Sequence, residues 1–215
     1  MALIATTASF TFAHVPVSFG IRAGLSNAGI RGDAVKSFDQ LLGFTNGMVA
    51  TGDRTGFFAG GYVHIPVSEQ IAIEPAVYYS QKGMALQGDL GLKGVEMLGA
   101  NARARLNTQY IDIPVVLKLN LNGFQVFAGP QVSYLSDASL RASAGVLGLN
   151  LLNTTISATN QFNRWDAALT GGVGYTFTNG TNLSAAYDHG ITRVDANRNA
   201  NAYNRAIKVG IGFQF

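Results

Sequence analysis

Three histidines are the residues of this chain best suited to acid-base chemistry: His14, His64 and His189. A hydrolase acting on lipid would need a serine or similar nucleophile within reach of a histidine and an acid. His14 lies in an apolar N-terminal stretch, His64 near a short turn and His189 near a long connector, so the last two are expected at opposite ends of the molecule. The sequence therefore predicts no catalytic residue. Because the chain has no cysteine, it offers no thiolate metal site, and we expect neither a metal nor a cofactor.

A second set of chemically capable residues consists of charged side chains that stand among Gly, Ser and Thr in extended runs. Its members are Arg22, Glu74, Asp112, Lys118, Asp188 and Lys208. Both signs of charge are present, so the side chains could form a path for ions or protons, or they could neutralise one another as a structural ion-pair network. We favour the network, because a narrow interior needs side chains that fill it and fix its shape.

Composition limits the class of protein. Only 13% of the 215 residues are charged, about half the usual share of a soluble domain, and the net charge of +3 is scattered rather than arranged as a stripe for nucleic acid. The first residues, "MALIATTASFTFA", are apolar and end in small side chains, as in the apolar region of a secretory signal. We predict a signal remnant over 1–13 and a single domain over 14–215.

The domain is expected to be built from strands, because apolar residues recur at every second position in eight runs. Each run has about ten residues, the length that a tilted strand needs to cross a bilayer. The runs are Val17–Ser26, Phe57–Ile65, Ile71–Ser80, Ile111–Leu119, Phe124–Tyr134, Trp165–Phe177, Asn182–Asp188 and Ile207–Phe215.

The connectors between these runs alternate between short and long. Tight turns carry Gly, Asn or Pro at 66–70, 120–123 and 178–180, whereas longer connectors span 27–54, 81–109, 138–163 and 192–202. Short turns on one side and long loops on the other are typical of outer-membrane barrels. The sequence therefore predicts an all-β, eight-stranded, antiparallel up-and-down transmembrane β-barrel.

The two faces of the runs predict which side of the barrel meets lipid. One face is uninterruptedly apolar, and the other holds small residues and the charged set. A membrane barrel keeps charge inside and apolar side chains outside. Aromatic residues at run ends on the apolar face predict an interfacial girdle. They are Tyr79, Phe124, Tyr134, Trp165, Phe177 and Tyr203.

Several stretches together resemble a known family: "FGIRAGLS", "GFFAGGYVHIPVSEQIAIEPAVYYSQKG", "YIDIPVVLKLNLNGFQVFAGPQVSYL" and "AALTGGVGYTF". They resemble the porin-like, or PorT-like, outer-membrane β-barrel domain of Bacteroidota-type bacteria, from about Val17 to Phe215. The resemblance implies a signal peptide, an eight-stranded barrel and an outer-membrane location in the cell envelope. Ile211, Phe213 and terminal Phe215 look like the signal that the barrel-assembly machinery reads. Some relatives contribute to secretion and gliding machinery, so the family does not imply one function.

The expected function is a structural, anchoring or loop-mediated interaction role in the outer membrane, without enzymatic activity. Eight strands leave room only for side chains, so a wide pore is not expected. Partners would be outer-membrane lipid, the barrel-assembly machinery and an extracellular or secretion-machinery protein. Two alternatives stay open: a narrow porin-like channel for small solutes or ions, and a soluble lipocalin-like barrel that binds a small apolar ligand.

Two connector segments are unusually apolar for solvent loops. In "DAVKSFDQLLGF" the residues Val35, Phe38, Leu41 and Leu42 share one helical face, and "GVLGLNLLNTTI" is apolar along its length. A partner surface, mutual packing of the loops, or strands that continue past the membrane as hairpins would each explain the pattern.

Overall fold

Nearly all of the described part of the chain is β-strand. The computed structural model describes residues 16–32, 49–89, 101–146, 149–194 and 202–215, and within them it contains nine strands and one 3-10 helix. The predicted signal segment 1–13 and the segment "DAVKSFDQLLGF" lie outside these ranges. None of the described helices is long and apolar enough to cross a membrane. The elements are β1 (Ser18–Arg31), β2 (Val49–Pro66), β3 (Ile71–Asp89), β4 (Asn101–Leu121), β5 (Phe124–Val146), β6 (Leu149–Ser157), η2 (Thr159–Gln161), β7 (Trp165–Thr176), β8 (Thr181–Gly190) and β9 (Tyr203–Gln214).

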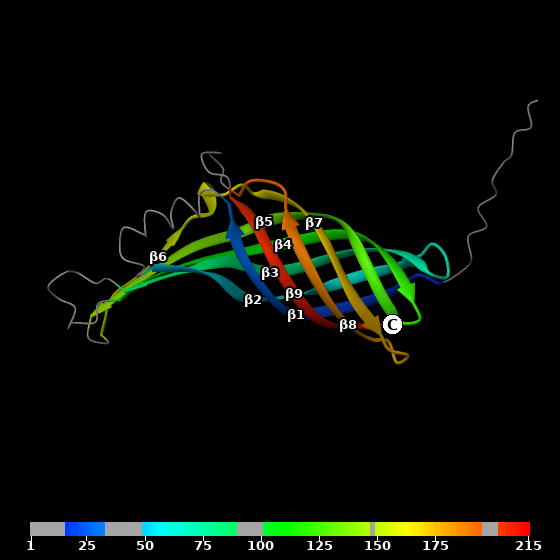
Figure 1. The fold of residues 1–215 in the computed structure, drawn as a ribbon. Coiled ribbons are helices and arrows are strands. Elements are labelled where there is room, and N and C mark those ends of the chain that lie inside the picture. The colour runs from blue at the N-terminus through cyan, green and yellow to red at the C-terminus, as the bar shows by residue number, and fades with distance from the viewer. Residues whose placement is uncertain (1–15, 33–48, 90–100, 147–148, 195–201) are drawn as a thin grey trace, which may run out of the picture.

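Eight of the strands close into an antiparallel barrel (Figure 1). The order around the ring is β1, β2, β3, β4, β5, β7, β8 and β9, and β9 pairs back with β1. At this seam Phe215 and Phe19 exchange backbone hydrogen bonds, with N···O distances of 2.9 and 3.2 Å. The ring therefore leaves no open edge beside the final residue, and the predicted eight-stranded barrel is confirmed.

Short turns join the strands at one end of the barrel, which we call the turn end. Between β4 and β5 the turn is Asn122 and Gly123, both with positive φ (53° and 91°), as a two-residue hairpin turn requires. The amide of Gly123 donates to the Asn120 side chain at 3.0 Å. A Gly with φ of 85°, Gly180, closes the turn between β7 and β8. These three positions fix the strand register at the turn end.

At the opposite end, the loop end, strands continue well beyond the barrel as a sheet extension (Figure 1). We define the sheet extension as residues 81–89 of β3, 101–109 of β4, 137–146 of β5 and all of β6. The predicted connectors 81–109 and 138–163 are thus largely strand, and "GVLGLNLLNTTI" lies mostly in the paired strands β5 and β6. Of the three explanations for that segment, the strand pairing of β5 with β6 agrees with strands that continue beyond the barrel.

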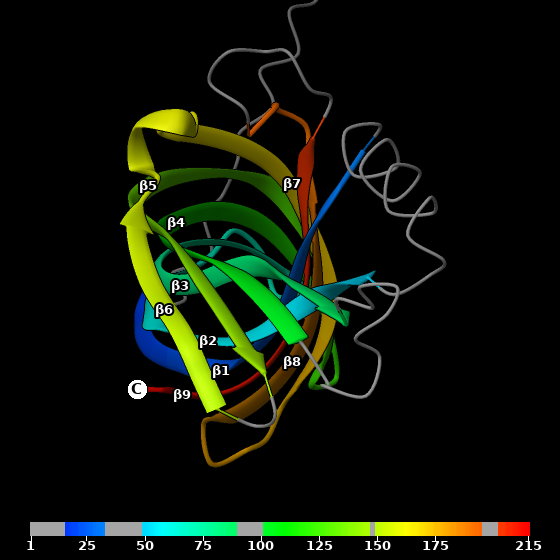
Figure 2. The ribbon, with the colours of Figure 1, turned by 90° about the vertical axis from the view of Figure 1, so that its left-hand side faces the viewer.

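Strand β5 has two different neighbours along its length. Its first half, Phe124 to Tyr134, pairs with β7, and its second half, Ser139 to Val146, pairs with β6. Strand β6 is therefore a ninth strand of the sheet that lies outside the closed ring. Seen from the loop end, the ring and the strands that project from it are distinct (Figure 2).

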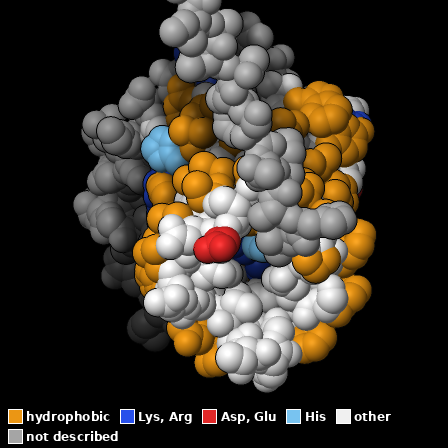
Figure 3. Space-filling view, turned by 90° about the vertical axis from the view of Figure 1, so that its right-hand side faces the viewer, with side chains coloured by type: hydrophobic (Ala, Val, Ile, Leu, Met, Phe, Trp, Pro, Cys, Tyr) orange, Lys and Arg blue, Asp and Glu red, His pale blue; other side chains and the backbone are white. Residues whose placement is uncertain are grey.

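The barrel is apolar outside and polar inside. On β9, Ile207, Val209 and Ile211 are 57–59% exposed, whereas Asp112 in the interior is 0% exposed. From the turn end, basic, acidic and histidine side chains lie near the middle of the face, with hydrophobic side chains around the rim (Figure 3). This arrangement is the one that lipid requires, so the soluble lipocalin-like alternative, with a polar exterior and an apolar cavity, is wrong.

Candidate functional site in the lumen and at the loop end

The lumen holds two ion-pair clusters, one above the other. In the turn-side cluster, the Glu74 carboxylate accepts a hydrogen bond from Arg22 Nη1 at 3.0 Å and another from Lys118 Nζ. His64 Nδ1 lies 3.8 Å from the same carboxylate. Glu74 comes from β3, Arg22 from β1 and Lys118 from β4, so the cluster ties three strands together across the barrel.

Aromatic and amide side chains complete the turn-side cluster. Arg22 Nη1 also donates to the Tyr78 hydroxyl at 2.9 Å, and its guanidinium lies 4.4 Å from the centre of the Tyr62 ring. Asn182 on β8 accepts from Arg22 at 3.3 Å and donates to the Tyr62 hydroxyl at 2.8 Å. Arg22 and Asn182 thus each donate to a named acceptor, and hydrogen-bonded polar groups of this kind stabilise a narrow interior.

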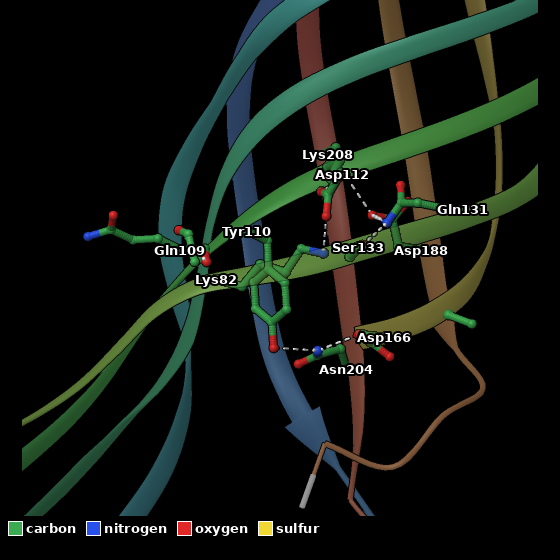
Figure 4. Close-up of polar contacts among 12 residues, drawn as sticks. Lys82, Gln109, Tyr110, Asp112, Gln131, Ser133, Asp166, Asp188, Asn204 and Lys208 are labelled. Carbon is green, nitrogen blue, oxygen red and sulfur yellow. Dashed lines mark hydrogen bonds and ion pairs between the residues drawn. The ribbon is translucent and has the colours of Figure 1, made fainter. Parts of the chain in front are cut away.

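The loop-side cluster contains two cations and two anions (Figure 4). Asp112 accepts from Lys82 Nζ at 2.8 Å and from Lys208 Nζ at 3.0 Å, and Lys208 also pairs with Asp188 at 2.6 Å. Gln131 Nε2 lies 3.4 Å from the Asp188 carboxylate. The four charges cancel, so this layer can be buried without a net charge in the low-dielectric barrel.

Nearer the loop end, the lumen first contains polar side chains around the Asp166 carboxylate and then becomes apolar. Asn204 donates to Asp166 at 2.6 Å and to the Tyr110 hydroxyl at 3.4 Å, as Figure 4 shows. Beyond them lie two clusters of buried apolar side chains, with Phe162 packed against both. We call these residues the apolar cap: Ile30, Leu106, Leu135, Ala138, Phe162, Val194 and Ala202.

The apolar cap is held by backbone bonds as well as by packing. The amide of Leu135 donates to Arg164 at 2.8 Å, that of Asn163 to Val194 at 2.9 Å, and that of Val194 to Ala202 at 2.9 Å. These backbone hydrogen bonds join the segments before β7 and after β8 to each other and to β5 at the loop end of the lumen.

A small cavity remains between the two ion-pair clusters. Its volume is about 50 Å³, and its lining includes Arg22, Glu74, Phe127, Gln131 and Lys208. A space of this size with charged and amide groups in its wall can hold a few water molecules. The cavity lies between residues of both clusters, where water can hydrate the buried charges.

The structure places all six predicted lumen residues, Arg22, Glu74, Asp112, Lys118, Asp188 and Lys208, in the interior. It brings them together as two groups of three. Lys82 was missed because it lies beyond the predicted run Ile71–Ser80, and Asp166, inside the run Trp165–Phe177, was left out of the predicted charge set. The signal that could have found Lys82 is its spacing of eight residues from Glu74, which keeps it on the same face of β3.

The two histidines in the described part of the chain lie at opposite ends of the barrel and do not share one site. His64 lies inside the turn-side cluster, while His189 is exposed on the outer face with its ring 6.1 Å from that of Tyr187. His64 pairs with Ser18 at the turn end, and His189 pairs with Arg205 toward the loop end, so the two are at opposite ends. Among the described residues, no group of three His, Asp or Glu side chains could hold a metal ion.

Aromatic side chains gather at both ends of the outer face. Tyr79 on β3, Tyr134 on β5 and Trp165 on β7 lie in one row of paired residues. In this row Tyr79 pairs with Ile111 of β4, Ile111 with Tyr134, and Tyr134 with Trp165. The Tyr134 and Trp165 rings are 5.1 Å apart, and Trp165 is 58% exposed. We call this row the aromatic row. Tyr203 begins β9 at the loop end, whereas Phe124 and Phe177 flank turns at the turn end.

The outer face changes from apolar to polar immediately beyond the aromatic row. On β4 the outward side chains are apolar at Ile113, Val115 and Leu117, but they are polar at Gln109, Asn107 and Arg105. On β3, β4 and β5 the row that follows is Gln81, Gln109 and Asp137. Because the strands run straight through this change, the outer face of one continuous sheet has a polarity border here, of the kind expected where a barrel passes from lipid to water.

Beyond the same border the inward face becomes more apolar. Leu106 is buried in the apolar cap, and Leu140 and Ile156 on β5 and β6 are 36% and 57% exposed. The sheet extension therefore has polar side chains on its outward face and more apolar ones on its inward face, as in a sheet in water. The barrel has the opposite arrangement, with apolar side chains outside, as in a sheet in lipid.

Comparison with known proteins agrees with this geometry. A family model described as an outer membrane protein beta-barrel domain matches residues 8–196. No curated protein sequence matches the chain significantly. Among solved structures, Neisserial surface protein A aligns with a TM-score of 0.49 at 15% identity, covering 94% of this chain and 100% of that one. Ail of Yersinia pestis aligns at 0.47 and 11% identity over 94% and 100% of the two chains, and OprG from Pseudomonas aeruginosa at 0.41 and 13% over 92% and 95%.

The family match spans most of the chain, and the eight strands close with their apolar faces outward as an outer membrane demands. The chain belongs to the outer membrane protein beta-barrel domain family and is a bacterial outer-membrane protein.

Proposed function

We propose that this protein is a non-conducting barrel that anchors the sheet extension at the cell surface, where the extension meets a partner. The observation that carries the proposal is the filled lumen. Two ion-pair clusters occupy the barrel interior, and the apolar cap covers the loop end. A barrel with no open path through it acts through the surfaces it displays.

The side on which the extension is displayed follows from the connectors. Outer-membrane barrels have short periplasmic turns and longer extracellular segments. The tight turns and the paired ends Phe19 and Phe215 lie together at the turn end. The turn end is thus assigned to the periplasm and the sheet extension to the outside, where an extracellular or secretion-machinery protein is the proposed partner. A closer relationship to the PorT-like proteins of Bacteroidota is part of this proposal, as is cleavage of a signal peptide.

The alternative function is a narrow channel for small solutes or ions. The observation in its favour is the cavity of about 50 Å³ between charged residues in mid-lumen. To conduct, this chamber would have to open through the Glu74 cluster on one side and through Asp112 and the apolar cap on the other. That requires simultaneous separation of several buried ion pairs, which is costly.

Planar-bilayer recording separates the two functions. The purified barrel should give no current steps above the empty bilayer, while a wide porin of about sixteen strands inserted in the same way should give clear steps. Reproducible steps from the wild-type protein would contradict the closed-lumen proposal. Insertion is checked on the same sample by mobility in SDS with and without boiling.

A second experiment tests whether the extension is separate from the anchor. Replacing residues 140–156 with a short turn removes most of β6 and the end of β5, but keeps the β5 residues that pair with β7. We expect the shortened protein to assemble and to keep its heat-dependent mobility shift. Loss of the shift would mean that the extension is needed to hold the barrel, and the proposed division of roles would fail.

A further inference from the structure

A groove crosses the lipid-facing side of the barrel, over the neighbouring strands β8, β9, β1 and β2 (Figure 1). Its volume is about 420 Å³. The outward-facing residues that line it are Ile21, Ala23, Ala59, Thr181, Ile211 and Phe213. Thr181 alone among them has a polar side chain. The groove is therefore an apolar hollow in the surface that an outer-membrane barrel turns toward lipid.

The groove forms because two small residues face each other among large ones. Ala23 of β1 pairs directly with Ala59 of β2. The outward residues on either side of Ala23 along β1 are Ile21 and Leu25, which are 60% and 64% exposed. Side chains on one face of a strand repeat about every 7 Å, so two paired methyl groups leave a floor below the level of their neighbours.

The groove runs across the strands. Two adjacent rows of paired residues form it: Thr181, Phe213 and Ile21 in one row, and Ile211, Ala23 and Ala59 in the other. Strands are spaced by about 4.8 Å, so the path from β8 to β2 is about 14 Å long, and the rows are about 7 Å apart. Because barrel strands are tilted by about 40°, a path across them climbs through the membrane instead of staying at one depth.

The two ends of the groove differ in height and chemistry. At the turn end, Thr181 directly follows Gly180, the glycine that closes the turn between β7 and β8. At the other end, Ala59 pairs with Tyr79 of the aromatic row, and the Tyr79 ring lies 5.7 Å from that of Phe57. A ligand that enters beside the Thr181 hydroxyl thus runs inward from the leaflet at the turn end until it reaches two aromatic rings.

The dimensions of the groove select its occupant. A helix with its side chains is about 10 Å across, which is wider than the distance of about 7 Å between the rows. An added strand would find no free edge here, because β8, β9, β1 and β2 are paired on both sides within the closed ring. An acyl chain is a single file of methylene groups without hydrogen-bonding groups, so it matches a narrow apolar groove. The groove is also continuous with the surface that lipid covers.

We infer that this groove binds one acyl chain of a phospholipid from the leaflet at the turn end, more tightly than the rest of the barrel wall binds its surrounding chains. Within lipid, association gains no hydrophobic driving force and depends on van der Waals packing. A chain in the groove contacts protein below it and on both sides, whereas a chain on a flat wall contacts protein on one side. The inference does not depend on whether the lumen conducts.

The test maps where lipid chains lie on the full-length barrel. The protein is reconstituted in phosphatidylcholine vesicles that contain a small share of phosphatidylcholine with a photoreactive diazirine in mid-chain. After irradiation, mass spectrometry locates the labelled residues, which should be concentrated in the groove on β1, β2 and β9. The double variant Ala23→Leu, Ala59→Leu fills the floor and should lower labelling there at least about fivefold, because the packing on three sides is lost.

Ala185→Leu is the matched control. Ala185 also faces lipid, but it pairs with Val173 and Val209 outside the groove. This variant should be labelled in the groove as the wild type is. Even labelling of all lipid-facing strands in the wild type would overturn the inference, and so would equal groove labelling in the double variant.

Two further measurements keep the result interpretable. The single variant Ala23→Leu changes one exposed side chain and should show a partial loss of groove labelling even if the double variant does not fold. A heat-dependent mobility shift in SDS confirms that each variant is folded. Dimers of the wild type in native mass spectrometry that Ala23→Leu abolishes would overturn the inference, because the occupant would then be a second copy of the chain. A current in the bilayer experiment would refute the closed lumen and leave this inference standing, so the two failures are distinguishable.

Discussion

Asp112→Asn should be among the most damaging conservative substitutions in this barrel. Asp112 is 0% exposed and accepts hydrogen bonds from two buried ammonium groups, those of Lys82 and Lys208. The asparagine keeps the shape of the side chain but removes its charge. Lys208 retains Asp188 at 2.6 Å, whereas Lys82 loses the one carboxylate with which it pairs among the described residues.

The size of the effect follows from that unpaired ammonium. Removing one partner of a buried ion pair costs about 3 to 5 kcal/mol, because the remaining charge is left desolvated. The Tyr110 ring, 4.7 Å from Lys82 Nζ, offsets a part of this cost by cation–π attraction, on the order of 1 kcal/mol. We therefore expect the free energy of unfolding to fall by about 2 to 4 kcal/mol.

The assay is urea unfolding of the barrel in lipid vesicles, followed by the fluorescence of the single tryptophan, Trp165. Glu69→Gln, in the exposed turn between β2 and β3, is the control for loss of one negative charge and should leave the unfolding curve unchanged. Adding Lys82→Met to Asp112→Asn should restore most of the loss, since it removes the unpaired charge. If Asp112→Asn unfolds like the Glu69 control, water solvates the lumen freely and the closed-lumen reasoning is refuted.

Three other predictions concern packing, assembly and depth in the membrane. Gly20→Val should lower the free energy of unfolding by about 1 to 3 kcal/mol, because a Cβ at Gly20 would lie 2.2 Å from the buried Tyr62 ring. Gly61→Val is the control in the same urea titration. It should be tolerated, because the nearest atom to a Cβ at Gly61 is 3.6 Å away. Deleting Phe215 removes both backbone bonds to Phe19 at the seam, and it removes the last residue of the proposed assembly signal, which also includes Ile211 and Phe213. The outer-membrane fraction should therefore contain far less heat-modifiable barrel for this variant than for the control Arg164→Gln at an exposed residue. Equal amounts would count against the signal. Trp165, 58% exposed in the aromatic row, should be quenched more by lipids brominated near the headgroup than by lipids brominated at the chain ends, and the opposite order would remove the row from the interface.

The strands were predictable in the region where lipid lies on one side and packed side chains lie on the other. There the outward positions of β4 from Ile111 to Leu119 are all apolar, and simple alternation identifies both the strand and its two faces. The same strand continues back to Asn101, but its outward residues Gln109, Asn107 and Arg105 no longer follow the apolar pattern. The predicted boundary of the strand was thus the polarity border of its outer face, and residues such as Lys82 fell outside it.

The partners within the lumen could not be predicted in the same way. Lys82 and Lys208 meet at Asp112 from 30 and 96 residues away, and the meeting depends on strand tilt and register. A bulge at Ser136, between the pairs Gln109 with Asp137 and Tyr110 with Leu135, shifts which β5 side chains face inward. Alternation can show that a charge faces inward, but not which opposite charge it will find.

Because β5 pairs first with β7 and then with β6, the two flanks of the barrel differ in height. Strands β3, β4 and β5 rise far beyond the membrane border, while β7, β8 and β9 end close to it, so the wall is tall on one flank and low on the other. A neighbour that diffuses in the plane of the membrane meets different surfaces according to the direction from which it arrives. The protein is thus asymmetric within the plane of the bilayer as well as across it. A partner that binds the sheet extension would approach from the flank formed by β3, β4 and β5.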